Sequence, residues 1–180
     1  MFNGYSIRVA RRKDIHHLPY VERDAARRFA IFGLDETSSA SIPLELLEQR
    51  QSCGQLWVAI DRADKPVGFA VASVLDDHGH IDELDVSVQH GRRGLGSRLV
   101  KTVCRWAYRA QLKGVTLSTL RTIPWNAPFY AKLGFEVMQE DELSEGLQRL
   151  RQLEALAGLP VGQRVIMLRD KGDPGQIRQP

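Results

Sequence analysis

Three glycines and three arginines stand within the stretch HGRRGLGSRLV, which begins at His90. A glycine-rich loop brings backbone N–H groups close to a ligand, and the start of a helix adds partial positive charge. Both properties favour the binding of a phosphate or another anion. Glycine-rich turns also serve as plain connectors, so the neighbouring residues must decide between the two interpretations.

Three kinds of phosphate loop compete for this stretch, and each needs particular residues beside the glycines. A dinucleotide-binding fingerprint that begins at Gly94 needs glycine or alanine at Leu99 and an acidic residue about 20 positions later, and both are missing. A nucleoside triphosphate loop needs a lysine after its last glycine, where this chain has Ser97 and Arg98. A pyrophosphate loop that follows an antiparallel strand fits, because the strand-like IDELDVSV runs directly into QHGRRGLG.

Hydrophobic periodicity and capping residues predict the elements that must position this loop. Two helices come first, then an antiparallel run of three strands, and then alternating strands and helices. Asp14 is expected to cap the first helix, Gly114 to end the helix after the loop, and residues 76–80 to form a turn. The expected helices are 14–31, 43–52, 96–112, 126–135 and 143–157, and the expected strands are 5–9, 56–60, 66–75, 81–88, 115–119, 135–138 and 164–168.

The composition fits one globular domain. The chain has 180 residues, of which 43% are hydrophobic, so we expect a single domain over 5–169 and a flexible tail over 170–180. A net charge of +3 comes from scattered basic residues, which argues against a nucleic-acid partner. The sequence shows neither a signal peptide nor a span of about 18 apolar residues, and Cys53 and Cys104 lack disulfide or metal spacing. We therefore expect a cytoplasmic protein without a membrane partner.

Two segments about thirty residues apart together resemble the GNAT (Gcn5-related N-acetyltransferase) family. The first is the loop, which is similar to the family's R/Q-x-x-G-x-G/A signature between a strand and a helix. The second is TIPWNAPFYAKLGF, in which Asn126, Tyr130, Gly134 and Phe135 stand at matching positions. The loop departs from the signature at Gly91, which replaces the first R/Q, so either of the next two arginines could contact phosphate.

The resemblance spans roughly residues 7–168 and implies both a fold and a cofactor. The fold is the GNAT acyl-CoA N-acyltransferase fold of the α/β (α+β mixed) class, a twisted mixed and mostly antiparallel sheet with helices on both faces. The cofactor is acetyl-CoA, with its pyrophosphate on the backbone N–H groups of the loop. Glycines there remove the Cβ atoms that would hold the ligand away. The implied cofactor-binding residues are Val86, Ser87, Val88, Gly91, Arg92, Arg93, Gly94, Leu95, Gly96, Ser97, Asn126 and Phe129.

Two residues are expected to carry the chemistry of acetyl transfer. Tyr130 resembles the family's general acid, since a phenol is protonated at neutral pH and can give its proton to a departing thiolate. Glu83 is the candidate base, directly or through a water, because family members frequently use a carboxylate on this strand. The alternatives are a core tyrosine and a solvated carboxylate, and solvation is the favoured interpretation for Asp82 and Asp85. Asn126 is also well placed to cap the helix that follows it.

The other reactive side chains are expected to be structural. Cys104 lies at helical spacing from apolar residues, which indicates packing rather than a nucleophile in an acetyl-enzyme route. His78 and His80 flank a glycine in the predicted turn and are expected to be solvated. We expect no metal site, because none of these residues has further ligands at metal spacing.

The sequence therefore predicts an acetyl-CoA-dependent N-acetyltransferase in which a bound primary amine attacks directly in a ternary complex. The expected acceptor is a small-molecule amine, with a pocket built from residues 29–41 and 140–162. A protein lysine or an N-terminal α-amine is the alternative within the enzyme class. A non-catalytic CoA-binding regulatory module is the alternative from another class, and the resemblance also admits a homodimer.

Overall fold

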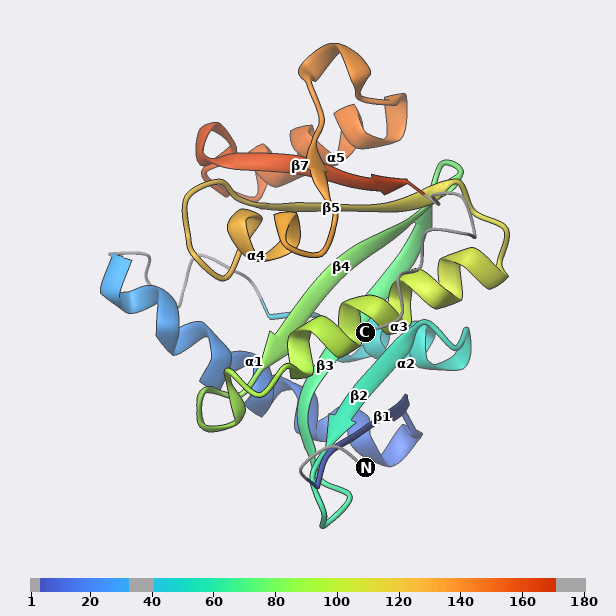
Figure 1. Cartoon of the computed structure of the whole chain (residues 1–180), viewed down its shortest axis with the longest axis vertical. Helices are drawn as coiled ribbons and strands as arrows, with labels where there is room; N and C mark the ends of the chain where they lie inside the picture. The colour runs from blue at the N-terminus through green and yellow to red at the C-terminus, as the bar shows by residue number, and fades with distance from the viewer. Residues whose placement is uncertain (1–3, 33–40, 171–180) are drawn as a thin grey trace. The chain divides into compact units, whose positions relative to one another are not determined.

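The computed structural model describes residues 4–32 and 41–170, and the chain divides into two compact units. The N-terminal unit comprises Met1–Ser73 and Ile81–Val103, and the C-terminal unit comprises Val74–His80 and Cys104–Pro180. Figure 1 labels their helices and strands. The predicted tail over 170–180 lies outside the described residues except for Asp170, which ends β7, and residues 33–40 of the predicted acceptor segment also lie outside them.

The first half of the chain runs from β1 to α3. Its elements are β1 (Ser6–Val9), η1 (Arg12–His17), α1 (Leu18–Ala26), η2 (Arg27–Phe32), α2 (Leu44–Ser52), β2 (Leu56–Ile60), β3 (Pro66–Leu75), β4 (His78–Val86), η4 (Val88–His90) and α3 (Leu95–Arg109).

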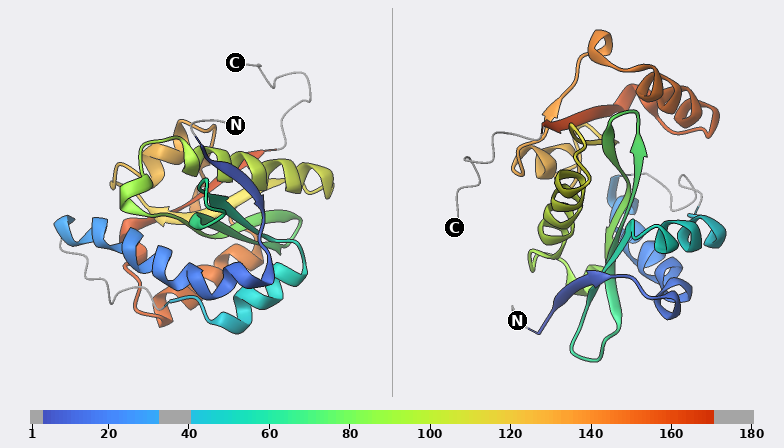
Figure 2. Two further views of the ribbon diagram at one scale, coloured as in Figure 1. Left: turned by 90° about the horizontal axis from the view of Figure 1, so that it is seen from below. Right: turned by 90° about the vertical axis from the view of Figure 1, so that its right-hand side faces the viewer.

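The strands of the N-terminal unit follow the order β1-β2-β3-β4, with β2 antiparallel to both β1 and β3. Every residue of β2 is buried, which means that the strand is covered on both faces. Figure 2 shows α1 and α2 on one side of β2 and β3 and the first turns of α3 on the other. Apolar side chains fill the space under α1 and α2, among them Ile15, Leu18, Val21, Leu47, Val58, Phe69 and Val71.

The first helical stretch is interrupted, so the prediction of one helix capped by Asp14 is wrong. Pro19 lies in the first turn of α1 and cannot donate to the preceding turn, which separates α1 from η1. Asp14 lies inside η1, where its carboxylate accepts a hydrogen bond from the Arg11 backbone N–H at 2.7 Å. The same buried carboxylate forms an ion pair with Arg8 at 2.6 Å, and it thereby ties η1 to β1.

The turn between β3 and β4 is shorter than predicted. β4 already begins at His78, and it ends at Val86 rather than at residue 88. His80 is therefore a strand residue and only 4% exposed, so the prediction of a solvated histidine is wrong. Its Nδ1 lies 2.9 Å from Thr116 Oγ1, a partner 36 residues away that the local sequence pattern could not supply.

The second half of the chain continues with β5 (Gly114–Leu120), α4 (Ala127–Ala131), β6 (Glu136–Val137), η5 (Glu140–Glu142), α5 (Glu145–Leu156), η6 (Val161–Gln163) and β7 (Arg164–Asp170). In the C-terminal unit, β7 lies between β5 and β6 and is antiparallel to both. Figure 2 shows α4 and α5 on opposite faces of β5 and β7. Leu143, Leu147 and Ile166 form the core under α5.

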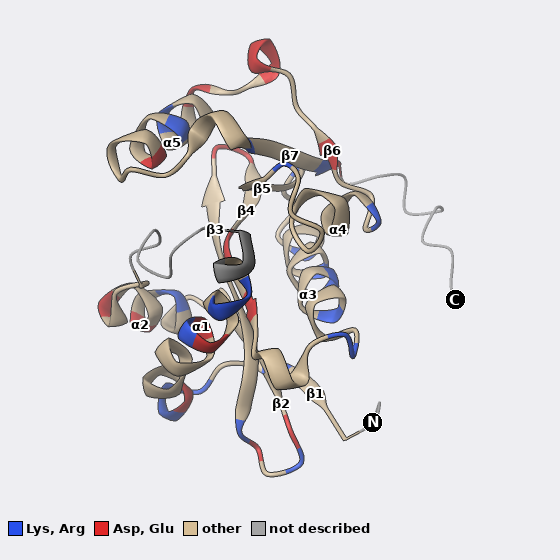
Figure 3. Cartoon of the chain, turned by 90° about the vertical axis from the view of Figure 1, so that its left-hand side faces the viewer, with Lys and Arg blue, Asp and Glu red and all other residues tan. Residues whose placement is uncertain are grey.

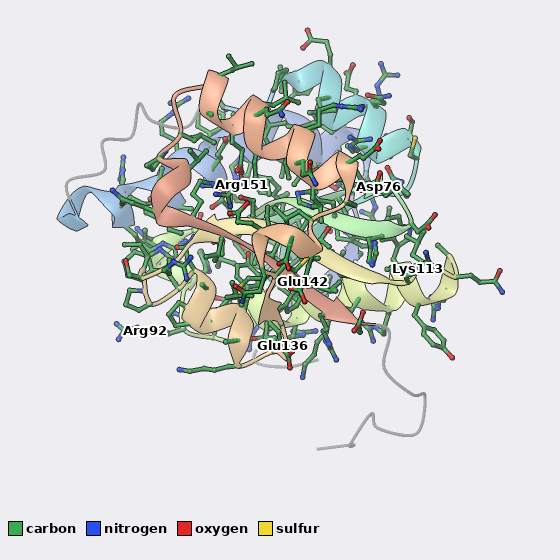
Figure 4. The ribbon with its side chains drawn as sticks, turned by 90° about the horizontal axis from the view of Figure 1, so that it is seen from above. Asp76, Arg92, Lys113, Glu136, Glu142 and Arg151 are labelled. Atoms are coloured by element: carbon green, nitrogen blue, oxygen red, sulfur yellow. The ribbon has the colours of Figure 1, made fainter. Side chains whose placement is uncertain are left out.

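One turn residue, Gly114, differs from its predicted role. α3 ends at Arg109, and the left-handed residue after it is Gln111 (φ 59°) rather than Gly114. Gly114 instead opens β5, where a Cβ would lie 2.6 Å from the carbonyl oxygen of Arg169 in β7. Asp76, labelled in Figure 4, accepts a hydrogen bond from Ser144 Oγ at the start of α5, which joins the β3–β4 turn to that helix.

The described part of the structure confirms the predicted fold class, an α/β protein with mostly antiparallel strands and helices on both faces. None of its helices combines the length and apolar character that crossing a bilayer requires.

The burial of His80 predicts a specific loss of stability in acid. Burial, and then the charge of Arg164, lowers the pKa of His80 to about 4, whereas an unfolded histidine titrates near 6.5. The unfolded state therefore takes up the proton first, so stability is full above about pH 6.5 and falls as the pH drops toward 4. By pH 5 this one group should cost about 2 kcal/mol of unfolding free energy.

The test is urea denaturation of wild type and His80→Asn at pH 7 and pH 5. The decrease in unfolding free energy between these pH values should shrink by about 2 kcal/mol in His80→Asn. His16→Asn, the same change at an exposed histidine, should leave the decrease as in wild type. Equal decreases in all three proteins would contradict the assignment to His80.

Candidate active site

The loop between β4 and α3 is anchored on both sides of its start. The Ser87 N–H donates to the carbonyl of Val67 in β3, and the Val88 N–H donates to Asp24 Oδ2 in α1, each at 2.9 Å. The backbone then takes the left-handed conformation at Arg92 (φ 55°) and at Gly94 (φ 75°). A left-handed arginine is uncommon, which indicates that the surrounding contacts determine this turn rather than the local sequence.

Six consecutive N–H groups follow this turn, from Arg92 to Ser97. Within residues 4–32 and 41–170, no protein acceptor receives a hydrogen bond from any of them. The first hydrogen bond of α3 is the one from the Arg98 N–H to the carbonyl of Gly94, at 3.1 Å. Consecutive N–H groups in a turn that leads into a helix start form a concave set of donors for an anion. The local geometry thus fits the predicted phosphate loop.

Space beside the loop is available where a phosphate would need it. A Cβ placed on Gly94 would meet no protein atom within 4 Å, so this glycine is not required by packing against the protein. Its positive φ and its open side leave the backbone free to approach a ligand. The residues present therefore fit the pyrophosphate of a CoA cofactor.

The two arginines at the turn have different surroundings. The Arg93 guanidinium carbon lies 5.7 Å from the centre of the Tyr5 ring, and Arg93 Nη2 donates to the carbonyl of Gln89 at 3.4 Å. Arg92 is exposed and forms no hydrogen bond or ion pair with any residue that the structure describes. Figure 3 shows both as a basic segment ahead of α3, and Figure 4 shows the Arg92 side chain pointing outward. Within the described residues, the Arg92 guanidinium is thus the less constrained of the two.

Three carboxylates gather around β4 in the N-terminal unit. Asp85 is only 8% exposed, so the prediction that it is solvated is wrong. Burial, and then the charges of Glu83 and Glu22, raises the pKa of the Asp85 carboxyl well above its usual value, while Arg28 opposes the shift. A carboxyl with such a pKa can exchange a proton nearer to neutral pH. Asp82, by contrast, accepts a hydrogen bond from Ser73 Oγ at 2.8 Å.

Sequence reasoning missed Glu22, because it lies on α1, far from β4 along the chain. Its carboxylate accepts hydrogen bonds from Ser41 Oγ at 2.6 Å and from the Ile42 N–H at 3.3 Å. These contacts hold the residues that follow the undescribed segment 33–40 against α1. The only sequence signal was its helical spacing from apolar residues, since Leu18 precedes it by four positions and Ala25 follows it by three.

The other predicted site residues lie in the C-terminal unit, on and next to α4. Tyr130 is 8% exposed, and its ring packs edge-on against Phe129 and Phe135, with centres 5.0 and 5.7 Å away. Asn126 stands at the N-cap position of α4 as predicted, and its backbone carbonyl accepts hydrogen bonds from the Phe129 and Tyr130 N–H groups, but its side chain forms no cap hydrogen bond. Its Nδ2 donates instead to Thr119 Oγ1 at 2.7 Å, while its buried Oδ1 lacks a donor among the described residues. A buried acceptor of this kind fits a ligand N–H, such as an amide of a pantetheine arm.

Cys104 in α3 is half-buried, and its Sγ lies 3.7 Å from Arg169 Nη1. Burial raises the pKa of this thiol despite the opposing charge of Arg169, so the thiolate needed for a nucleophile is disfavoured. The raised pKa of Cys104 agrees with a packing role rather than a catalytic one. In the described ranges, no three His, Cys, Asp or Glu side chains gather in a way that could hold a metal ion.

Comparison with known families identifies the class of protein that this loop and these strands define. The model of the acetyltransferase (GNAT) family matches residues 23–135, which is more than half of the chain. The match includes β4, the phosphate loop and α4. The chain therefore belongs to the GNAT acetyltransferase family, and it is an acetyltransferase that uses acetyl-CoA.

Solved structures share the fold at low sequence identity. N-acetylglutamate synthase from Neisseria gonorrhoeae, complexed with coenzyme A and N-acetyl-glutamate, matches with a TM-score of 0.68 and 23% identity over 94% of this chain, which spans 35% of that protein. The PaiA N-acetyltransferase from Thermoplasma acidophilum, in complex with coenzyme A, matches with a TM-score of 0.65 and 16% identity. The match covers 92% of this chain and 98% of that protein. The ribosomal-protein-S18-alanine N-acetyltransferase from Escherichia coli matches with a TM-score of 0.64 and 13% identity. The match covers 97% of this chain and 99% of that protein. Two of these proteins are named for different acceptors, so the shared fold leaves the acceptor of this chain open.

The open space at Gly94 predicts a selective loss of cofactor binding. In Gly94→Trp, the indole should occupy the space that the pyrophosphate needs, at a folding cost of about 1 kcal/mol from the positive φ. Calorimetric titration with CoA should show binding to wild type and none to the variant.

Gly158→Trp is the matched control, because Gly158 also has a positive φ (79°) and an equally open side but follows α5 in the C-terminal unit. It should bear a similar folding cost and keep wild-type affinity for CoA. Wild-type affinity in Gly94→Trp would show that the phosphates bind elsewhere.

Proposed function

We propose that this acetyltransferase acts on a primary amine of a small molecule, by direct attack of the bound amine in a ternary complex. The observation that carries the proposal is the buried Asp85 carboxyl between the charges of Glu83 and Glu22. The charges of Glu83 and Glu22, which act on this carboxyl, create a negative potential that attracts an ammonium group. Because Asp85 is nearly enclosed, a slender amine suits this environment better than a bulky surface.

The attacking nitrogen must lose a proton before or during the reaction, which gives the carboxylates their role. We assign Glu83 as the base, acting directly or through a water, because it lies beside Asp85 on β4 and is half-buried. A neighbouring carboxyl with a raised pKa can share the proton that Glu83 accepts. The negative cluster would also stabilise the cationic amine before that transfer.

Acetyl-CoA supplies the thioester, in which the C–S bond breaks as the new C–N bond forms. We assign Tyr130 as the residue that holds a proton on its hydroxyl and delivers it to the sulfur. The enclosed ring, packed against Phe129 and Phe135, fixes the direction of that hydroxyl. The nitrogen of a bound ammonium loses two protons in all: one passes through the carboxylates to solvent, and the other balances the proton that Tyr130 gives to the thiolate. The net products are therefore an amide, a free thiol and one released proton.

For cofactor binding, we assign the pyrophosphate to the N–H groups from Arg92 to Ser97 and to the Arg92 side chain. The pantetheine arm is assigned to β4 and to Asn126 Oδ1. Since the N–H of Val88 is already taken by Asp24, the backbone of Val86 is the better candidate on this strand. The full proposed set is Val86, Ser87, Val88, Gly91, Arg92, Arg93, Gly94, Leu95, Gly96, Ser97, Asn126 and Phe129.

A protein lysine or an N-terminal α-amine is the second candidate acceptor, supported only by the fold shared with the ribosomal-protein-S18-alanine enzyme. A screen separates the two, with free thiol measured as the product. Small mono- and diamines are tested against peptides that carry a lysine or a free N-terminus. Turnover with a small amine and none with the peptides supports the proposal, and the reverse result contradicts it.

Both described cysteines are free thiols, which supports a reducing cytoplasm as the location.

Removal of the Tyr130 hydroxyl should slow the reaction without weakening cofactor binding. Tyr130→Phe keeps the packed ring, so we expect kcat to fall about 10²- to 10⁴-fold while the Kd for acetyl-CoA is unchanged. Tyr108→Phe, the same change at an exposed tyrosine of α3, should keep wild-type kcat. Wild-type turnover in Tyr130→Phe would exclude its role as the acid.

Glu83→Gln tests the base against the general field of the carboxylates. If Glu83 is the base, Glu83→Gln should lower kcat/KM for the amine about 10²-fold or more. Asp82→Asn removes the same charge from the adjacent position of β4 and serves as the control. Equal, small decreases in both variants would mean that only the field acts and that Glu83 is not the base.

A further inference from the structure

Tyr5, directly before β1, reaches the phosphate loop from 85 residues away. Its hydroxyl lies 2.8 Å from Nδ1 of His90, and the two rings meet edge to face at 5.7 Å and 83°. Tyr5 is 9% exposed, so this hydrogen bond is largely shielded from water. A hydrogen bond that is shielded from water fixes the relative position of the two segments, because water cannot easily replace either partner.

Tyr5 also contacts the far side of the same turn. The Arg93 guanidinium lies over the Tyr5 ring at 5.7 Å, within the range of a cation–π interaction. His90 and Arg93 stand immediately before and after the pair Gly91 and Arg92. A single aromatic side chain therefore holds both ends of the part of the loop where the backbone reverses.

This part of the loop needs external support. Arg92 has a left-handed backbone, which costs an ordinary residue about 1–2 kcal/mol, and a glycine precedes it. Among the described residues, two backbone hydrogen bonds brace the turn before it, from the His90 N–H to Ser87 and from the Gly91 N–H to Val88, at 2.9 and 3.1 Å. Released from Tyr5, the turn would relax toward conformations in which the following N–H groups no longer converge.

We infer that Tyr5 is a positioning residue for the phosphates of the cofactor: its contacts with His90 and Arg93 hold the loop in its anion-binding form before the cofactor arrives. The cofactor thereby avoids the cost of ordering the loop, which is the general benefit of preorganisation. The stacking of Arg93 on Tyr5 has a second effect, since it leaves Arg92 as the arginine available to the phosphates. The inference depends on acetyl-CoA as the acetyl donor and not on the nature of the acceptor.

The test uses Tyr5→Phe, which keeps the ring and both ring contacts and removes only the hydroxyl. Loss of one hydrogen bond worth about 0.5–1.5 kcal/mol should raise the Kd for CoA about 2- to 12-fold in calorimetric titration. Backbone hydrogen exchange at residues 88–97 should quicken in the cofactor-free protein. Tyr20→Phe is the matched control, because Tyr20 is 62% exposed on α1, and it should change neither quantity.

His90→Asn approaches the same hydrogen bond from its half-exposed partner and covers the case in which Tyr5→Phe folds poorly. If Tyr5 acts through His90, the double variant should bind CoA no more weakly than the weaker of the two single variants. Additive losses, or a wild-type Kd in Tyr5→Phe, would overturn the inference, as would faster loop exchange with unchanged affinity. Because exchange is measured without cofactor, a failure of the wild type to bind CoA would be recognised separately as a failure of the cofactor assignment.

Discussion

The arrangement depends on one constraint, the run of backbone N–H groups from Arg92 to Ser97, for which the described residues provide no acceptor. Backbone donors are normally paired, and a run without acceptors persists only where solvent or a ligand completes it. Contacts from three other elements keep the run in place. β3 receives a hydrogen bond from Ser87, Asp24 of α1 accepts one from Val88, and Tyr5 braces His90. The phosphate loop is thus a product of the whole N-terminal unit.

Opposite electrostatic environments occur along one short stretch of that unit. Asp85 and Glu83, near the end of β4, belong to a negative cluster that includes Glu22. Only a few residues later, the chain presents free N–H groups and an exposed arginine. An enzyme that joins an amine to an acetyl group carried by a phosphorylated cofactor needs both environments. The order of residues from 83 to 97 supplies them in one continuous segment.

Local sequence patterns predicted the elements and the loop, and they failed where distant residues decide. Alternation and apolar runs located β2, β3, β5 and β7, and the glycines located the turn before α3. The wrong predictions that His80 and Asp85 are solvated share one cause. Each residue has polar neighbours in the sequence, but elements far along the chain bury it. Asn126 stands at the predicted N-cap position of α4, but its side chain donates to the distant Thr119 instead of capping the helix. Tyr5 carried no local signal at all.

The most direct test of the account is a nuclear magnetic resonance titration that follows the backbone amides of residues 92–97. CoA is compared with pantetheine, which lacks the phosphates. The account predicts that CoA shifts these six amides strongly, in the direction of hydrogen bonding to an anion, and that pantetheine leaves them nearly unchanged. Equal shifts with both ligands, or CoA-induced shifts confined to other parts of the chain, would contradict the claim that this loop binds the pyrophosphate.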